Sequence, residues 1–273
     1  MDARISGRYN PRMEETGDLL GRGLEALGLG GANPGGSAPG SEGSDGSGPG
    51  DGSDLESALR RYLAEIESWN PTHGLVSASG DELVVKHILD SLAPWREILA
   101  LLKAMDEERS RRGIRGGSGL ADLGTGAGLP GIPLSLVFKE RPCALVERMG
   151  KRIAFLESMK AILGLDNARV VMAEAENAPG PLELVTFRAF RPFSELKLFK
   201  AVWRRMEDWG CFVAYKGRLE AVRGELDALA TNPEFSKVAR TAEILPVEVP
   251  FLDEERCLVI MRKAASLRDQ QKG

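Results

Sequence analysis

The residues best suited to chemistry lie in one glycine-rich stretch, residues 122–131, which reads DLGTGAGLPG. Glycines at 124, 126 and 128 permit a sharp turn, and they let a ligand approach the backbone closely because no Cβ stands in the way. A helix that follows such a turn has N–H groups at its start that lack partners within the helix. The stretch therefore predicts a cofactor-binding loop between a strand and a helix.

Two further residues indicate which cofactor this loop binds. The dinucleotide fingerprint G-x-G-x-x-G needs a third glycine where Leu129 stands, which disfavours NAD. Glu147 ends the next predicted strand, 23 residues after Gly124, where a carboxylate can accept hydrogen bonds from both hydroxyls of a ribose. Together these features favour S-adenosyl-L-methionine, with its methionine carboxylate held by loop amides. The alternative, a glycine-rich turn without a ligand, is less favoured because such open turns destabilise a fold.

Composition excludes several other classes of protein. The chain has 273 residues, of which 42% are hydrophobic and 28% charged, as in soluble globular domains. No apolar run reaches the roughly 18 residues of a membrane helix and no secretory signal begins the chain, so we expect a cytoplasmic protein. Three scattered cysteines and two histidines predict no metal site, and no Ser-His-Asp or Cys-His arrangement is indicated.

The net charge of −4 is unevenly distributed along the chain. Residues 1–54 hold four arginines and nine acidic residues, so they account for the whole negative balance. The remaining residues are close to neutral. Overall charge therefore neither requires nor excludes a nucleic-acid partner, and any contact with RNA must be a local basic patch.

Short apolar runs alternate with helical patterns from Leu120 onward. The predicted strands are 120–123, 143–147, 168–172, 182–187 and 210–215, and the predicted helices are 129–139, 150–163 and 193–209. This alternation predicts an α/β protein with a doubly wound, Rossmann-like sheet. With the predicted S-adenosyl-L-methionine loop, we expect the sheet to be of the class I methyltransferase type. Two further runs, 242–249 and 256–261, are joined by a short turn, and we expect them to pair antiparallel at one edge of the sheet.

The rest of the chain divides into segments by composition. Residues 1–54 are expected to be a flexible extension, since 28–53 contain 11 Gly, 5 Ser and 3 Pro. Leucines at 19, 20, 24 and 27 would fit a short amphipathic turn, but a frayed appendage is the favoured interpretation. Residues 55–118 predict a helical cap followed by a basic linker from Arg109, which is either a solvated connector or an RNA contact. Residues 119–263 form the methyltransferase domain, and 264–273 a C-terminal tail.

Six short runs, in order along the chain, resemble one known family. They are Trp69-Asn70, Lys86-His87-Ile88-Leu89-Asp90-Ser91, residues 122–134, Gly150-Lys151-Arg152, Arg188-Ala189-Phe190 and Lys216-Gly217. The family is RsmG, also called GidB, and the resemblance spans about residues 55–263. Its members are bacterial methyltransferases that modify N7 of one guanine in 16S ribosomal RNA. The resemblance therefore implies an enzyme that uses S-adenosyl-L-methionine and takes small-subunit ribosomal RNA, free or in a ribonucleoprotein particle, as its substrate.

The glycine pattern and the resemblance together give a set of candidate site residues. The cofactor-binding set is Gly124, Thr125, Gly126, Gly128, Leu129, Glu147, Ala175, Glu176 and Arg188. The resemblance implies that Glu147 binds the ribose, that Ala175 and Glu176 lie beside the adenine, and that Arg188 is the catalytic residue near the reacting end. Guanine N7 carries an in-plane lone pair, so its methylation needs alignment and no general base.

Basic residues are candidates for the rim that meets RNA phosphates. They are Lys86, His87, Lys151, Arg152 and Lys216. Lys86 and His87 have a structural alternative, which is to cover apolar surface. We expect a monomer. Two other functions stay open: methylation of another RNA or of a small molecule, and a non-catalytic RNA-binding role in ribosome assembly.

Overall fold

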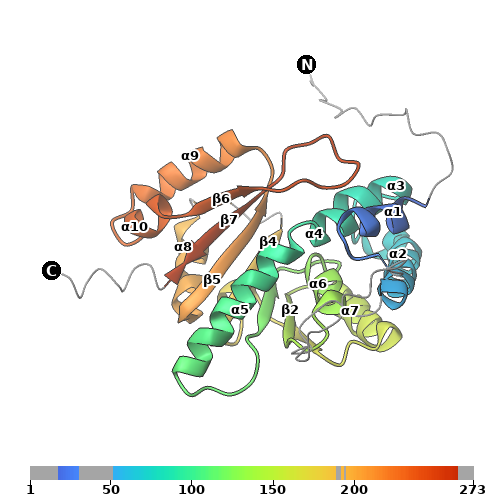
Figure 1. The fold of residues 1–273 in the computed structure, drawn as a ribbon, viewed down its shortest axis with the longest axis horizontal. Helices are drawn as coiled ribbons and strands as arrows, with labels where there is room; N and C mark the ends of the chain where they lie inside the picture. Colours follow the sequence, from blue (N-terminus) through green and yellow to red (C-terminus); the bar gives the residue numbers. More distant parts are fainter. Residues whose placement is uncertain (1–17, 31–51, 189–191, 194, 264–273) are drawn as a thin grey trace, which may run out of the picture.

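The computed structural model describes residues 18–30, 52–188, 192–193 and 195–263. Its centre is a seven-stranded sheet with the order β3-β2-β1-β4-β5-β7-β6 (Figure 1). The strands are β1 (Leu120–Leu123), β2 (Cys143–Glu147), β3 (Ala168–Met172), β4 (Leu182–Arg188), β5 (Met206–Lys216), β6 (Glu243–Pro246) and β7 (Cys257–Arg262). The first five strands pair in parallel, and β7 runs antiparallel to both β5 and β6. The Rossmann-like fold class and the antiparallel pair at one edge are thus confirmed.

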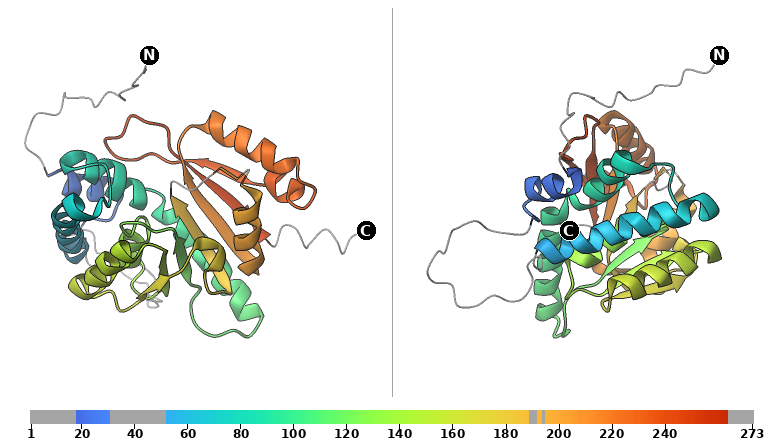
Figure 2. Two further views of the ribbon diagram at one scale, coloured as in Figure 1. Left: turned by 180° about the vertical axis from the view of Figure 1, so that it is seen from behind. Right: turned by 90° about the vertical axis from the view of Figure 1, so that its right-hand side faces the viewer.

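Helices cover both faces of this sheet. In chain order they are α1 (Leu19–Ala26), α2 (Gly52–His73), α3 (Gly80–Leu83), the π-helical turn η1 (Val84–Leu89), α4 (Asp90–Leu92), α5 (Trp95–Arg111), α6 (Gly131–Val137), α7 (Gly150–Leu163), the 3-10 turn η2 (Ala175–Asn177), α8 (Leu196–Arg205), α9 (Leu219–Ala230) and α10 (Ser236–Arg240). In Figure 1, α1, α2 and α3 lie at the opposite end of the molecule from α9 and α10, and the left-hand view of Figure 2 shows the same arrangement from behind. No helix within the described ranges is long and apolar enough to cross a membrane.

Successive residues of each strand face two separate cores. Leu120 and Cys143 pack with the cap, α6 and α7, whereas Ala121 and Ala144 belong to the core formed with α8, α9 and α10. Side chains alternate between the faces of a strand, so a strand covered on both faces is mostly apolar. The short apolar runs predicted the bounds of β1, β2 and β3 correctly, although β1 contains the buried Asp122 and β3, at the edge of the sheet, exposes Arg169 and Met172.

The N-terminal region contains the largest correction to the expected organisation. The expectation of a flexible extension with a frayed leucine segment is wrong for residues 19–29, which form α1 and the turn after it. Leu20, Leu24, Leu27 and Leu29 are buried in the same core as the cap, and Trp95 Nε1 donates to the Leu27 carbonyl at 3.0 Å. The apolar area that this packing buries offsets the entropy of ordering the segment. Residues 1–17 and 31–51 of the expected extension, and the tail 264–273, lie outside the described residues.

Other differences concern where helices end. α5 continues to Arg111, so the predicted basic linker begins inside a helix. Arg109 pairs with Glu183 and donates to the Gly116 and Arg115 carbonyls, at 3.0 and 2.8 Å. These hydrogen bonds hold the loop after α5 in place.

The helix predicted at 193–209 is wrong from Met206 onward, because Met206 pairs with Leu182 of β4 as part of β5. Two helices in the C-terminal half, α9 and α10, were not predicted.

Candidate active site

The glycine-rich loop connects β1 to α6 and is hydrogen-bonded to the end of β2. The amides of Gly124 and Thr125 both donate to the Val146 carbonyl, at 2.8 and 3.0 Å. Gly124, Gly126 and Gly128 all have positive φ values, of 70°, 62° and 93°, a region that favours glycine. A Cβ on Gly128 would also overlap the side chain of Ile132. The glycines are thus needed for the shape of the turn itself.

Asp122 anchors this loop from beneath. Its Oδ2 accepts hydrogen bonds from Thr125 Oγ1 at 2.5 Å and from the Gly131 amide at 2.8 Å, and its Oδ1 accepts one from Thr186 Oγ1 at 3.2 Å. Burial raises the pKa of the Asp122 carboxyl to about 6, although these hydrogen bonds oppose the shift. The Thr125 side chain is therefore buried and stabilises the loop through Asp122.

The N–H groups of the loop are largely committed within the protein. Besides the two amides bound to Val146, those of Gly128 and Leu129 donate to the Thr125 carbonyl, at 2.8 and 2.9 Å. The Gly126 amide donates to Glu147 Oε2 at 3.0 Å. These five amides are thus engaged within the protein, as expected of a glycine turn that satisfies its own backbone groups locally. The expectation that loop amides hold the carboxylate of a cofactor stays a prediction.

Glu147 is a buried carboxylate fixed at the end of β2. Its Oε1 accepts hydrogen bonds from the amides of Arg148 and Met149, both at 2.9 Å, in addition to the Gly126 bond at Oε2. Arg152 Nη1 lies 3.6 Å from Oε2. A carboxylate offers about four lone-pair sites, so Oε2 keeps the capacity to accept a further hydroxyl.

A cavity of about 690 Å³ opens beside Glu147 at the carboxyl edge of the sheet. Six of the predicted residues line it: Gly124, Glu147, Arg152, Ala175, Glu176 and Arg188. Several lining residues were not predicted, among them Arg148, Glu174, Lys197, Leu198 and Arg205. Gly126 and Gly128 shape the loop behind it, and Leu129 is buried in the core with the cap.

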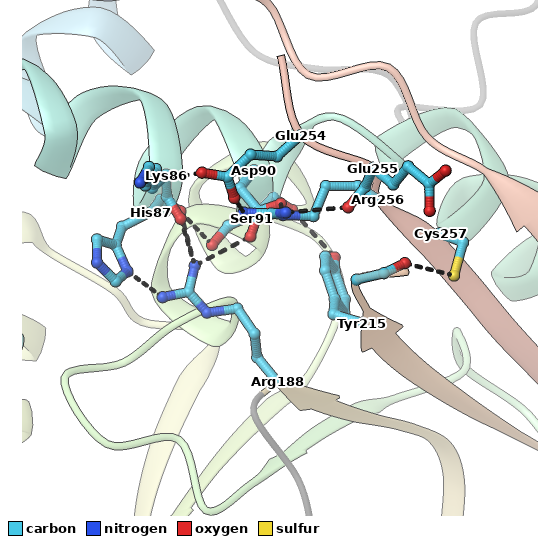
Figure 3. Close-up of polar contacts among 11 residues, drawn as sticks. Lys86, His87, Asp90, Ser91, Arg188, Tyr215, Glu254, Glu255, Arg256 and Cys257 are labelled. Carbon is cyan, nitrogen blue, oxygen red and sulfur yellow. Dashed lines mark hydrogen bonds and ion pairs between the residues drawn. The ribbon is translucent and has the colours of Figure 1, made fainter. Parts of the chain in front are cut away.

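Arg188 ends β4 and is held by the cap (Figure 3). Its Nη1 donates to the carbonyl oxygens of Lys86 and His87, at 3.3 and 3.2 Å, and lies 3.4 Å from Asp90 Oδ2. Its Nη2 donates to Nδ1 of His87. Burial and, to a smaller extent, the Arg188 charge lower the pKa of His87 to about 4, so the ring is neutral at pH 7 and can accept. The structure thus brings two predicted site residues together, and the His87 ring, predicted to contact RNA, contacts Arg188.

The remaining basic candidates fall into two groups. Lys86 pairs with Glu82 and Glu254, at 3.0 and 3.1 Å. Lys216 pairs with Glu225 at 2.7 Å and its ammonium lies 4.4 Å from the centre of the Phe193 ring. By contrast Lys151 is exposed at the start of α7 and has no partner among the described residues, and Arg152 reaches the cavity beside it.

Comparisons with known proteins agree on one family. The family model described as GidB, rRNA small subunit methyltransferase G, matches residues 55–245. A ribosomal RNA small subunit methyltransferase G of Treponema denticola is 32% identical over 77% of this chain and 87% of its own length. The protein of that name from Hydrogenovibrio crunogenus is 35% identical over 76% and 85%.

Solved structures are more distant. Cofactor-bound Rv0187 from MTB is 16% identical and covers 76% of this chain and 90% of its own, with a TM-score of 0.49. The fold is therefore assigned from the order and directions of the strands rather than from this structural similarity.

Proposed function

The chain belongs to the GidB family, rRNA small subunit methyltransferase G, and from this premise we propose that it methylates N7 of a guanine in a loop of 16S ribosomal RNA. As a member of the family it is a methyltransferase of small-subunit ribosomal RNA that uses S-adenosyl-L-methionine. The observation that carries the proposal is the cavity of about 690 Å³ lined by both Glu147 and Arg188.

The residues of this cavity fit S-adenosyl-L-methionine. Its volume lies in the range of roughly 300–1,000 Å³ that cofactor and ligand pockets have. Glu147 is fixed by three backbone amides and would accept a ribose hydroxyl. Ala175 and Glu176 of η2 would lie beside the adenine. Because most of the loop amides are engaged within the protein, Arg148 or Lys197 would supply the positive charge for the methionine carboxylate.

The proposed reaction needs little acid–base chemistry from the protein. Bound S-adenosyl-L-methionine supplies a methyl group on a positively charged sulfur, and guanine N7 offers its lone pair directly. The protein's part is to align the base and exclude water. Arg188 is suited to aligning the base because four acceptors of the cap hold its guanidinium. Its position is therefore fixed before the base binds.

The RNA must expose the target base. In A-form RNA the N7 edge lies in a deep, narrow major groove that side chains cannot enter. A guanine in a loop, or one turned out of its stack, can reach a cavity. We propose that Lys151 and Arg152 contact phosphates beside the cavity, and that the enzyme acts in the cytoplasm as a monomer.

The test uses 16S RNA and 30S particles from a strain that lacks the gene. Each is incubated with the full-length protein and S-adenosyl-L-methionine labelled in its methyl group, and the modified position is mapped by cleavage specific for 7-methylguanosine. We expect one labelled guanine in at least one of the two substrates. Label at another base or atom would contradict N7 specificity, and no label in either RNA would contradict the proposed function as a whole.

A further inference from the structure

A second cavity, of about 340 Å³, shares Arg188 with the cofactor cavity. It is lined by residues from the cap, from the ends of β4 and β5, from α9 and from the connection between β6 and β7: Asp90, Arg188, Tyr215, Lys216, Gly217, Glu225, Val247, Arg256, Cys257 and Leu258. Arg188 also lines the cofactor cavity. A ligand in the second cavity would therefore lie next to the same guanidinium as the cofactor, where the methyl-accepting base has to bind.

Ion pairs fix the walls of this second cavity (Figure 3). Arg256 Nε lies 3.1 Å from Asp90 Oδ1, and Lys86 pairs with Glu254 at 3.1 Å. Tyr215 donates through its hydroxyl to the Ser91 carbonyl at 3.0 Å. These contacts connect the β6–β7 connection and β5 to the cap, so the cavity has a defined shape before any substrate enters.

Glu225 is the one carboxylate of this cavity with an oxygen that is not engaged by the described residues. Its Oε2 accepts hydrogen bonds from Lys216 Nζ at 2.7 Å and from the Phe193 amide at 3.1 Å. Its Oε1 has no partner in the described part of the chain. The two oxygens of Asp90, in contrast, face Arg188 and Arg256. Glu225 is thus held in place by one oxygen and presents the other.

We infer that the second cavity receives the target base and that Glu225 accepts a hydrogen bond from the 2-amino group of guanine. The inference rests on the proposed function and adds the residue that selects the base. Guanine carries N7 and O6 on its major-groove edge, whereas its 2-amino group lies on the minor-groove edge. With N7 facing the cofactor cavity, the 2-amino group faces the wall that Glu225 forms.

The charges of the cavity suit a guanine nucleotide. Arg188, Lys216 and Arg256 stand against Asp90 and Glu225, which leaves a positive balance for an acceptor edge and a phosphate. Adenine lacks the 2-amino group, and its N1 is an acceptor that a carboxylate would repel. The Glu225 side chain is partly buried, at 22% exposed, so a base without the 2-amino group leaves one of its oxygens without the hydrogen bond that guanine supplies.

The experiment compares guanosine with inosine at the methylated position of the RNA. Inosine lacks only the 2-amino group and keeps N7, O6 and N1–H. For the wild type we expect kcat/KM to fall roughly 10- to 100-fold with inosine, the range of one hydrogen bond to a charged group. In Glu225→Gln we expect a lower kcat/KM for guanosine and an inosine penalty reduced to about threefold or less, since the carboxylate is gone.

Controls separate base recognition from a structural role. Glu220→Gln changes an exposed carboxylate in the first turn of the same helix and should keep the full inosine penalty. Cofactor affinity, measured by calorimetry, should be the same in Glu225→Gln and the wild type. If Glu225→Gln fails to fold, Glu225→Asp keeps a carboxylate and should retain part of the penalty.

The outcomes are distinguishable. An inosine penalty that is equal in the wild type and Glu225→Gln, or absent in the wild type, would overturn the role of Glu225 while the proposed methylation stands. A complete loss of the penalty in Glu225→Asp together with normal activity on guanosine would also overturn it. A wild type that methylates no 16S RNA would instead overturn the proposed function on which the inference rests.

Discussion

Arg188 donates a hydrogen bond through Nη2 to Nδ1 of His87, 101 residues earlier in the chain. The π-helical turn η1 places this ring, and the carbonyls of Lys86 and His87, around one guanidinium. Such turns are frequent at functional sites. His87 is thereby a positioning residue for Arg188.

Replacing His87 tests this arrangement. His87→Ala removes the acceptor and should lower kcat/KM for RNA methylation roughly tenfold, as expected when a hydrogen bond to a charged group of about 1.5 kcal/mol is lost. His87→Asn offers an amide oxygen close to the position of Nδ1 and should recover most of the activity. Equal activities of the two variants in a steady-state assay would show that the acceptor does not matter.

Glu147 should control cofactor affinity. Glu147→Gln keeps the size of the side chain but removes the charge that faces the cavity, and we expect S-adenosyl-L-methionine to bind roughly tenfold more weakly in calorimetry. Glu157→Ala, at an exposed position of α7, is the control. Unchanged affinity in Glu147→Gln would contradict the assignment of the ribose-binding residue.

Lys151 and Lys86 should differ in their contribution to RNA binding. Lys151 is exposed and Lys86 is held by two glutamates. Lys151→Ala should reduce the slope of log affinity against log salt concentration by about 1, the effect of losing one phosphate contact. Lys86→Ala should leave the slope nearly unchanged in the same titration. The reverse order would assign the phosphate contact to Lys86.

Asp122 should make stability depend on pH. Its pKa is about 6 in the folded protein against an ordinary value of 3.8, so the folded state binds this proton more tightly than the unfolded state. The stabilising contribution is complete below about pH 4 and is lost as the pH rises through about 6. Relative to Asp122→Asn, the wild type should lose at most roughly 3 kcal/mol of unfolding free energy over this range.

Urea unfolding at a series of pH values measures this difference. The exposed variant Asp166→Asn serves as the control. A difference between the wild type and Asp122→Asn that stays constant from pH 4 to pH 7 would be incompatible with a raised pKa.

The packing of α1 predicts a cost in stability when its core contacts are removed. Leu24 is fully buried, so Leu24→Ala should destabilise the protein by about 2–4 kcal/mol and lower its Tm. Leu19→Ala, at a half-buried position of the same helix, should have a smaller effect. A Tm of Leu24→Ala equal to that of the wild type would mean that α1 does not contribute to the core.

Local patterns predicted the strands of the cofactor half and the end of α7, where Gly164 takes a left-handed conformation. They did not predict every residue that lines the cofactor cavity, such as Arg148 and Lys197. The site residues Glu147, Ala175 and Arg188 follow directly after or within such strands, so strand assignment alone brings them to one edge. Their distance from one another along the chain does not matter in a parallel sheet.

Other features depend on contacts that local patterns do not contain. The expectation of a helical cap over residues 55–118 does not reveal the wider turn of η1, which is associated with the distant side chain of Arg188. The leucines of α1 are separated by residues 31–51 from the helices on which they pack, so their burial was not foreseen. Glu225 lies on α9, an element that was not predicted at all, and its role emerges only from the cavity that it lines.

The position of β7 has a consequence for how the protein is made. Residues 257–262 are synthesised after every other strand, yet they occupy the place between β5 and β6. While the nascent chain is still growing, β1, β2 and β3 can already pair, but β5 has an open edge of the kind that promotes misassociation. The sheet is therefore completed only after residues 257–262 have been synthesised, and a chain that stopped before residue 257 would leave the β5 edge unpaired.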